Sequence, residues 1–121
     1  MIKNGVDIEK VSRFLNRDED FFKTIFTDSE IKYCRAQPHP EQHFCGIYCA
    51  KEALSKALSD IVLDISYHDI CVKHNAKGAP YFAPCDKFLN VDISLSISHI
   101  NDIAVASVIL CCDTKNNPIK R

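Results

Sequence analysis

The chain has 121 residues, of which 46% are hydrophobic and 26% are charged, a composition typical of one globular domain. Its formal net charge of −1 argues against a strongly basic nucleic-acid-binding protein. No apolar run approaches the roughly 20 residues of a membrane-spanning helix, and the first residues lack the apolar stretch of a secretory signal. We therefore expect a cytoplasmic protein that binds neither nucleic acid nor a membrane.

The first strand is predicted over Ile2–Ile8, with Val6 and Ile8 on one face and Asp7 on the other. A helical stretch is expected from about Glu9, and the polar segment 16–20 can break it into two.

The next helix is predicted to run from Thr27 to about Ala36. Thr27 and Glu30 have the spacing of a capping box, in which each side chain bonds to the other residue's backbone. Pro38 and Pro40 prevent this helix from continuing.

The longest helix is predicted over 41–59, where four apolar residues recur at helical spacing: Phe44, Ile47, Leu54 and Leu58. Lys51 falls inside this stripe, which indicates either a constrained role or a lysine whose head group extends to water. Glu52 and Lys56 lie on its flank, one turn apart. From the helix alone they could be a surface pair worth about 0.2–0.5 kcal/mol.

Beyond Asp60 the pattern changes to short strands. Segments 69–74 and 80–82 flank a predicted hairpin turn that contains Gly78. Residues 91–98 alternate between apolar and polar types, and the segment 103–110, apolar except for Ser107, is typical of a buried partner strand. We expect a single α+β domain over 1–112, with a small antiparallel sheet around one long central helix, and a polar tail over 113–121.

Ligand types for zinc gather in one place, at His39, His43, Cys45 and Cys49, but a zinc site is disfavoured. No C-x₂-C pair occurs, and helical geometry turns His43 away from both cysteines. The seven cysteines are expected to be reduced thiols that mostly fill the core.

Three segments in register resemble the holo-[acyl-carrier-protein] synthase family of 4′-phosphopantetheinyl transferases. They are Gly5-Val6-Asp7-Ile8 with Arg13, then Ala50-Lys51-Glu52-Ala53 followed by Ser55-Lys56-Ala57, and finally Ser96-Ile97-Ser98-His99. The resemblance covers about residues 1–110 and implies the fold of that family.

The resemblance implies transfer of 4′-phosphopantetheine from coenzyme A to a serine of an apo acyl carrier protein. The products would be the holo carrier and adenosine 3′,5′-bisphosphate, and the reaction would need Mg²⁺. The expected partners are coenzyme A, a carrier of fatty-acid or polyketide synthesis, and further copies of this chain in a homotrimer. The alternative is a non-catalytic module of the same fold that trimerises or binds the carrier.

By the same resemblance, Asp7 and Glu52 would bind the metal, Glu52 and Lys56 would be catalytic, and Arg13 would dock the carrier. The residues expected to contact coenzyme A are Lys51, Lys56, Gly78, Pro80, Ser96 and His99.

Two departures weaken the expected contacts with the nucleotide. Ile47 stands where the family has an arginine for the 3′-phosphate, and Ala79 stands where the hairpin usually has a lysine. We therefore expect the 3′-phosphate to contribute little to binding. Asp18, Glu19 and Asp20 also dilute the basic surface expected to dock the carrier.

Overall fold

The computed structural model describes residues 1–112, so the predicted tail lies outside the described residues. The amino-terminal half contains strand β1 (Ile2–Lys10), the 3-10 turn η1 (Val11–Phe14) and helices α1 (Glu19–Ile25), α2 (Asp28–Arg35) and α3 (Pro40–Leu58). The remainder contains the turns η2 (Tyr67–Asp69) and η3 (Asp86–Phe88) and strands β2 (Val72–His74), β3 (Pro80–Phe82), β4 (Asp92–His99) and β5 (Ile103–Cys111).

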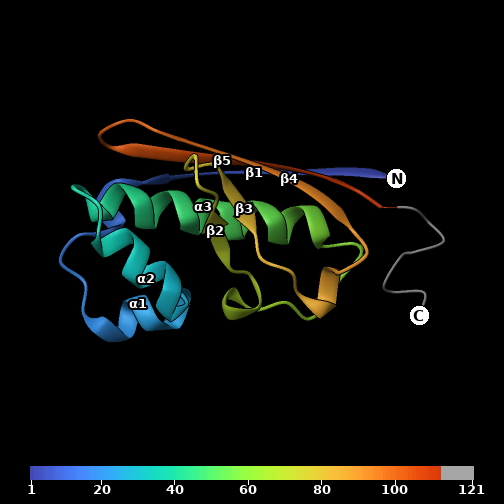
Figure 1. Cartoon of the computed structure of the whole chain (residues 1–121), viewed down its shortest axis with the longest axis horizontal. Helices are drawn as coiled ribbons and strands as arrows, with labels where there is room; N and C mark the ends of the chain where they lie inside the picture. The colour runs from blue at the N-terminus through green and yellow to red at the C-terminus, as the bar shows by residue number, and fades with distance from the viewer. Residues whose placement is uncertain (113–121) are drawn as a thin grey trace.

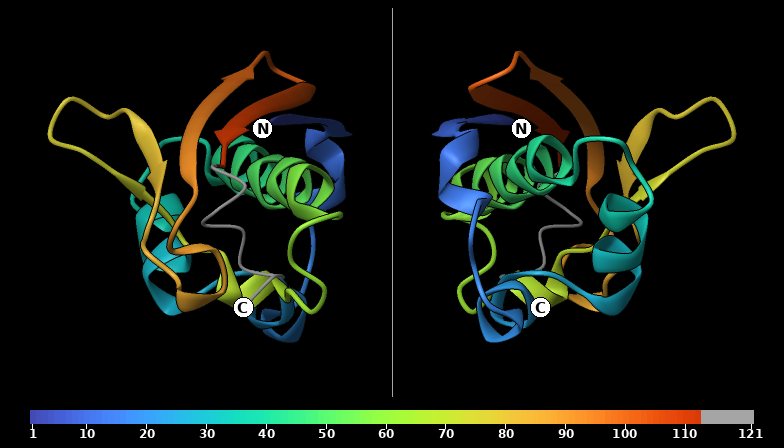
Figure 2. Two further views of the ribbon diagram at one scale, coloured as in Figure 1. Left: turned by 90° about the vertical axis from the view of Figure 1, so that its right-hand side faces the viewer. Right: turned by 90° about the vertical axis from the view of Figure 1, so that its left-hand side faces the viewer.

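The strands form two antiparallel sheets. One has the order β1-β5-β4, and the other is the β2–β3 hairpin. Figure 1 shows the larger sheet along one side of α3, with α1 and α2 on the opposite side of the helix. The end views show the hairpin projecting from the body beside β4 (Figure 2). The predicted α+β architecture, with a small sheet on a long helix, is confirmed.

The central helix is buried nearly all round, because it packs against the sheet on one side and against η1 and α2 on the other. The predicted stripe of Phe44, Ile47, Leu54 and Leu58 is buried. Burial of each large apolar side chain stabilises the fold by about 1.5–3 kcal/mol. The predicted capping box is also present, since Thr27 and Glu30 bond to each other's backbone at the start of α2.

The predicted helix start at Glu9 is wrong. Residues 9 and 10 continue β1, where they pair with Ala104 and Ile103 of β5. The first α-helix begins only at Glu19, after Asn16 has taken a left-handed conformation with a φ of 56°.

Strand β1 lies directly on α3. A Cβ atom at Gly5 would stand 1.9 Å from the backbone oxygen of Ala53, so only glycine allows this approach. Since strand side chains alternate, Asp7 shares the helix-facing side of β1 with Gly5. Val6 and Ile8 point away from the helix and are 58% and 65% exposed.

The outward side of the sheet carries a group of apolar side chains, which we call the outer apolar patch: Val6, Ile8, Val105 and Ile109. In the register of β1 and β5, Ile8 lies opposite Val105, and Ile109 follows four pairs further along, opposite Asn4. The prediction that 103–110 is buried throughout is therefore wrong for a single chain. Ala104, Ala106, Val108 and Leu110 are buried, whereas Ile109 is 53% exposed.

Candidate active site

The contact between β1 and α3 brings a carboxylate and an ammonium group together. The Lys56 Nζ atom lies 3.0 Å from Asp7 Oδ1 and also donates to the backbone oxygen of Val6 at 2.9 Å. Asp7 is mostly shielded, with 17% of its side chain exposed, whereas Lys56 is 55% exposed. Lys56 thus crosses to β1, and its interpretation as a surface partner of Glu52 is wrong.

Glu52 lies on the same side of α3, one turn before Lys56, and receives a hydrogen bond from another segment. The Tyr67 hydroxyl donates to Glu52 Oε1 at 2.7 Å. Burial, and then this bond to a carboxylate, raise the pKa of Tyr67, so the phenol keeps its proton. Sequence reasoning missed Tyr67, because nothing in the irregular segment before β2 indicates that one of its side chains bonds to Glu52 of α3.

These two carboxylates suit a hard cation. Mg²⁺ commonly takes one or two carboxylates from the protein and completes its coordination with water and phosphate oxygens. Asp7 and Glu52 offer that number of carboxylates, and each is half-buried. Asp7 contacts Lys56, which follows Glu52 by one turn of α3. The residues present therefore fit such an ion without further protein ligands.

Lys51 lies elsewhere, in the interior between α3 and the segment 67–72. Its Nζ atom is 2.8 Å from Glu30 Oε1 and 2.8 Å from the backbone oxygen of Tyr67, and it also donates to the backbone oxygen of Ile70. These bonds occupy all three protons of the ammonium group. The predicted contact with coenzyme A is inconsistent with this geometry, and the head group does not reach water either.

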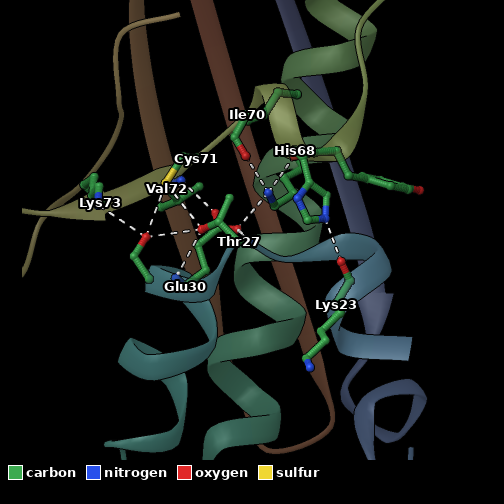
Figure 3. Close-up of polar contacts among 11 residues, drawn as sticks. Lys23, Thr27, Glu30, His68, Ile70, Cys71, Val72 and Lys73 are labelled. Atoms are coloured by element: carbon green, nitrogen blue, oxygen red, sulfur yellow. Dashed lines mark hydrogen bonds and ion pairs between the residues drawn. The ribbon is translucent and has the colours of Figure 1, made fainter. Parts of the chain in front are cut away.

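Glu30 completes this buried network (Figure 3). Its carboxylate accepts hydrogen bonds from the backbone N–H groups of Thr27, at 2.9 Å, and Val72, at 2.7 Å. Burial lowers the pKa of Lys51, and the charge of Glu30 opposes that shift. The pair thus joins α2, α3 and β2 inside the protein.

Three of the residues predicted to contact coenzyme A line one cavity of about 150 Å³: Gly78, Pro80 and His99. Gly78 has a φ of 87°, as the predicted turn requires, and the Asn75 side chain accepts hydrogen bonds from the backbone N–H groups on either side of it. Ile47 also lines the cavity. Sequence reasoning did not place His43 and His74 there, although they line it too.

The remaining predicted residues lie outside this cavity. Ser96 pairs with Ser107 on the outward side of the sheet, opposite the face that carries His99. Arg13 donates to Glu9 Oε2 at 2.6 Å and to the Tyr48 hydroxyl at 3.1 Å, with 40% of its side chain exposed. Within one chain, the structure does not bring Ser96 or Arg13 to the nucleotide residues.

Comparison with known proteins identifies consistent relatives. The sequence profile of the 4′-phosphopantetheinyl transferase superfamily matches residues 4–108. The holo-[acyl-carrier-protein] synthase of Finegoldia magna is 38% identical over 112 residues, covering 90% of this chain and 95% of the relative. That of Caldicellulosiruptor saccharolyticus is 35% identical over 114 residues, covering 87% and 92%.

Solved structures show the same fold. A Bacillus anthracis holo-(acyl-carrier-protein) synthase in complex with CoA (3′,5′-ADP) superposes with a TM-score of 0.80 at 29% identity, covering 92% of this chain and 96% of the other. A Helicobacter pylori holo-[acyl-carrier-protein] synthase in complex with coenzyme A gives 0.76 at 30% identity, covering 92% and 100%. Over residues 1–112, no helix is both long and apolar enough to cross a bilayer.

Proposed function

The chain belongs to the 4′-phosphopantetheinyl transferase superfamily, and we infer from this membership that it is a holo-[acyl-carrier-protein] synthase. It transfers 4′-phosphopantetheine from coenzyme A to a serine of an apo acyl carrier protein. The serine oxygen bonds to the β-phosphorus of coenzyme A, and the bond from that phosphorus to the bridging oxygen breaks. Adenosine 3′,5′-bisphosphate leaves.

The contact between Asp7 and Lys56 is the observation that carries this proposal, because it joins two separate signature segments of the family at one place, and Glu52 precedes Lys56 by one turn of α3. Lys56 neutralises charge on the pyrophosphate, since its partly exposed ammonium group can turn from Asp7 to an incoming phosphate oxygen. Glu52 accepts the proton of the attacking serine. The Tyr67 hydroxyl fixes the orientation of Glu52 for that step.

We further propose that Asp7 and Glu52 hold Mg²⁺. When bound, the ion supplies positive charge to the pyrophosphate oxygens and so favours departure of the nucleotide. Until a metal and substrate arrive, Lys56 compensates the charge of Asp7. Neither carboxylate bonds to the buried Lys51, and this supports their availability for a metal ion.

A homotrimer with the nucleotide between subunits is also proposed. The outer apolar patch supports association, because contiguous exposed apolar surface on a sheet favours a protein contact. A closed cyclic arrangement would bury that patch in every copy. It would also place the outward-facing Ser96 at a subunit contact. Within a single chain, Ser96 lies apart from the cavity.

The exposed part of Arg13 remains our proposed contact for an acidic carrier, on the surface beside η1. Its bonds to Glu9 and Tyr48 hold the guanidinium at that surface. Which carrier it meets, of fatty-acid or polyketide synthesis, is a matter for substrate comparison. The cytoplasmic location stays a prediction.

The test that separates the enzyme from a non-catalytic module follows the nucleotide. We expect adenosine 3′,5′-bisphosphate to appear by chromatography only when coenzyme A, Mg²⁺ and an apo carrier are all present. Omitting the carrier is the matched control. Binding of the carrier without release of nucleotide would favour the non-catalytic module instead.

A further inference from the structure

A buried tyrosine lies between the residue proposed to dock the carrier and the residue proposed to accept the serine proton. Tyr48 belongs to α3, is only 6% exposed, and precedes Glu52 by one helical turn. Its hydroxyl oxygen accepts a hydrogen bond from Arg13 Nη1 at 3.1 Å, and the guanidinium carbon lies 4.6 Å from the centre of its ring. Tyr48 therefore contacts Arg13 through both its hydroxyl and its ring.

The Tyr48 hydroxyl also lies beside the groups around Glu52. Because its oxygen accepts from Arg13, its own proton is available to a second acceptor. Burial raises the pKa of Tyr48, whereas its interaction with the Tyr67 hydroxyl lowers that pKa and its interaction with the Glu52 carboxylate raises it. The two tyrosine rings are 6.0 Å apart, and Tyr67 donates to Glu52 Oε1 at 2.7 Å. Polar groups thus run without interruption from Arg13 through Tyr48 to Glu52.

The core holds both tyrosines in place. The ring centroid of Phe14 lies 5.5 Å from that of Tyr48, and Lys51 donates to the backbone oxygen of Tyr67 at 2.8 Å. Replacing Tyr48 with phenylalanine would keep the ring and its packing and would remove only the hydroxyl group. The contribution of this hydroxyl can therefore be measured apart from the fold.

Arg13 can bind a carboxylate without releasing Tyr48. Its Nη1 atom donates to Glu9 Oε2 at 2.6 Å as well as to the Tyr48 hydroxyl. A guanidinium has five N–H groups, and the other three are on Nε and Nη2. Over residues 1–112, no protein group accepts from those three. One N–H on Nε and one on Nη2 form the fork that binds a carboxylate through two parallel bonds.

We propose that Tyr48 is a positioning residue that couples docking of an acidic carrier at Arg13 to the orientation of Glu52. The coupling rests on the proposed function, which gives these two residues their roles. Arg13 has 40% of its side chain exposed, so a bound carboxylate restricts a group that is otherwise partly free. The restricted guanidinium fixes the Tyr48 oxygen and directs the hydroxyl proton towards Tyr67 and Glu52. Glu52 is then held best for proton transfer when a carrier is present.

The kinetic test compares the unchanged chain with Tyr48→Phe in single turnovers. We expect the rate at saturating apo carrier to fall about five- to tenfold, in line with the loss of one hydrogen bond. The half-saturating carrier concentration should change less than about twofold, because Arg13 keeps its three free N–H groups. Tyr81→Phe is the matched control, since it removes the same hydroxyl from a tyrosine of β3 that is 48% exposed. It should change neither quantity.

Combining variants tests the coupling itself. In the unchanged chain, Arg13→Gln should raise the half-saturating carrier concentration and also lower the single-turnover rate. In the Tyr48→Phe background, the same substitution should raise that concentration equally but no longer lower the rate. Equal rate losses in the two backgrounds would overturn the coupling, as would a Tyr48→Phe rate within about twofold of the unchanged chain.

A measurement without transfer separates this inference from the proposed activity. The carboxyl ¹³C signal of Glu52, identified by its loss in Glu52→Gln, is followed by NMR as apo carrier is added without coenzyme A or Mg²⁺. It should shift in the unchanged chain and stay in place in Tyr48→Phe, although that variant still binds the carrier. A chain that modifies a carrier but shows no shift overturns the coupling alone. A Tyr48-dependent shift in a chain that modifies no carrier supports the coupling and contradicts the transferase.

Discussion

Lys51 and Glu30 form an ion pair with 2.8 Å between Nζ and Oε1, and neither side chain has any exposed surface. The pair does more than neutralise two charges. Glu30 accepts a hydrogen bond from the backbone N–H of Thr27 at the start of α2. Lys51 donates to the backbone oxygen of Tyr67, and the Tyr67 hydroxyl in turn donates to Glu52. Lys51 therefore positions the Tyr67 segment of the candidate active site, and it does not line the cavity of Gly78 and His99.

We expect Lys51→Met to reduce the free energy of unfolding by about 3–5 kcal/mol, because it leaves the Glu30 carboxylate buried without its partner. Lys56→Met is the matched control on the same helix. Its exposed pair with Asp7 should be worth less than about 1 kcal/mol. Urea denaturation measures both, and equal losses would contradict the structural role of Lys51. Below its melting temperature, Lys51→Met should still bind adenosine 3′,5′-bisphosphate normally.

Asp7→Ala and Glu52→Ala should each lower transfer by at least about a hundredfold while leaving the fold intact. The reason is that these carboxylates are the proposed protein ligands of Mg²⁺, and losing one strong electrostatic contact costs about 10²–10³ in rate. Turnover at millimolar Mg²⁺ and the melting temperature are the two measurements. Asp60→Ala is the control, since Asp60 pairs with Lys3 at the surface. Near-normal turnover in either site variant would show that the substituted carboxylate is not a ligand of the metal.

Val6→Lys should convert a trimer into a monomer, because it places a charge in the outer apolar patch that the proposed interface buries. Sedimentation at micromolar concentration measures the change. Ile100→Lys is the control, since Ile100 is 65% exposed, slightly more than Val6, but lies in the turn after β4. If the unchanged chain sediments as an active monomer, the trimer proposal is wrong.

At pH 8.5, coenzyme A and 3′-dephospho-coenzyme A should differ little in kcat/KM. Ile47 lines the cavity but offers no charge to the phosphate. Ile47→Arg should then raise the preference for coenzyme A about ten- to a hundredfold, the equivalent of one charge-assisted bond of about 1.5–3 kcal/mol. A preference above about thirtyfold in the unchanged chain at this pH would show that another cation holds the phosphate.

Local patterns were sufficient to predict much of the fold. The capping box of Thr27 and Glu30 defined the start of α2, and the apolar stripe of α3 defined the long helix, since both depend on residues close in the chain. The left-handed turn at Gly78 was predictable for the same reason. The start of the helical stretch was not predictable from local patterns, because pairing with β5 keeps Glu9 and Lys10 extended.

The surroundings of Lys51 depend on contacts between distant segments, which sequence reasoning did not foresee. Helical periodicity showed Lys51 inside an apolar stripe, but not that Glu30 and two backbone oxygens would meet it there. The alternation of the strand, in contrast, could already have separated Ser96 from His99. They lie three residues apart on a strand, which places them on opposite faces of the sheet.

The most direct test of the central claim is the mass of the carrier protein. The chain is incubated with coenzyme A, Mg²⁺ and an apo acyl carrier protein, in parallel with a carrier whose acceptor serine is alanine. Our account predicts that the first carrier gains one phosphopantetheine and that the second gains nothing. An unchanged mass across apo carriers of fatty-acid and polyketide synthesis, under conditions where the chain is folded and binds coenzyme A, would contradict it.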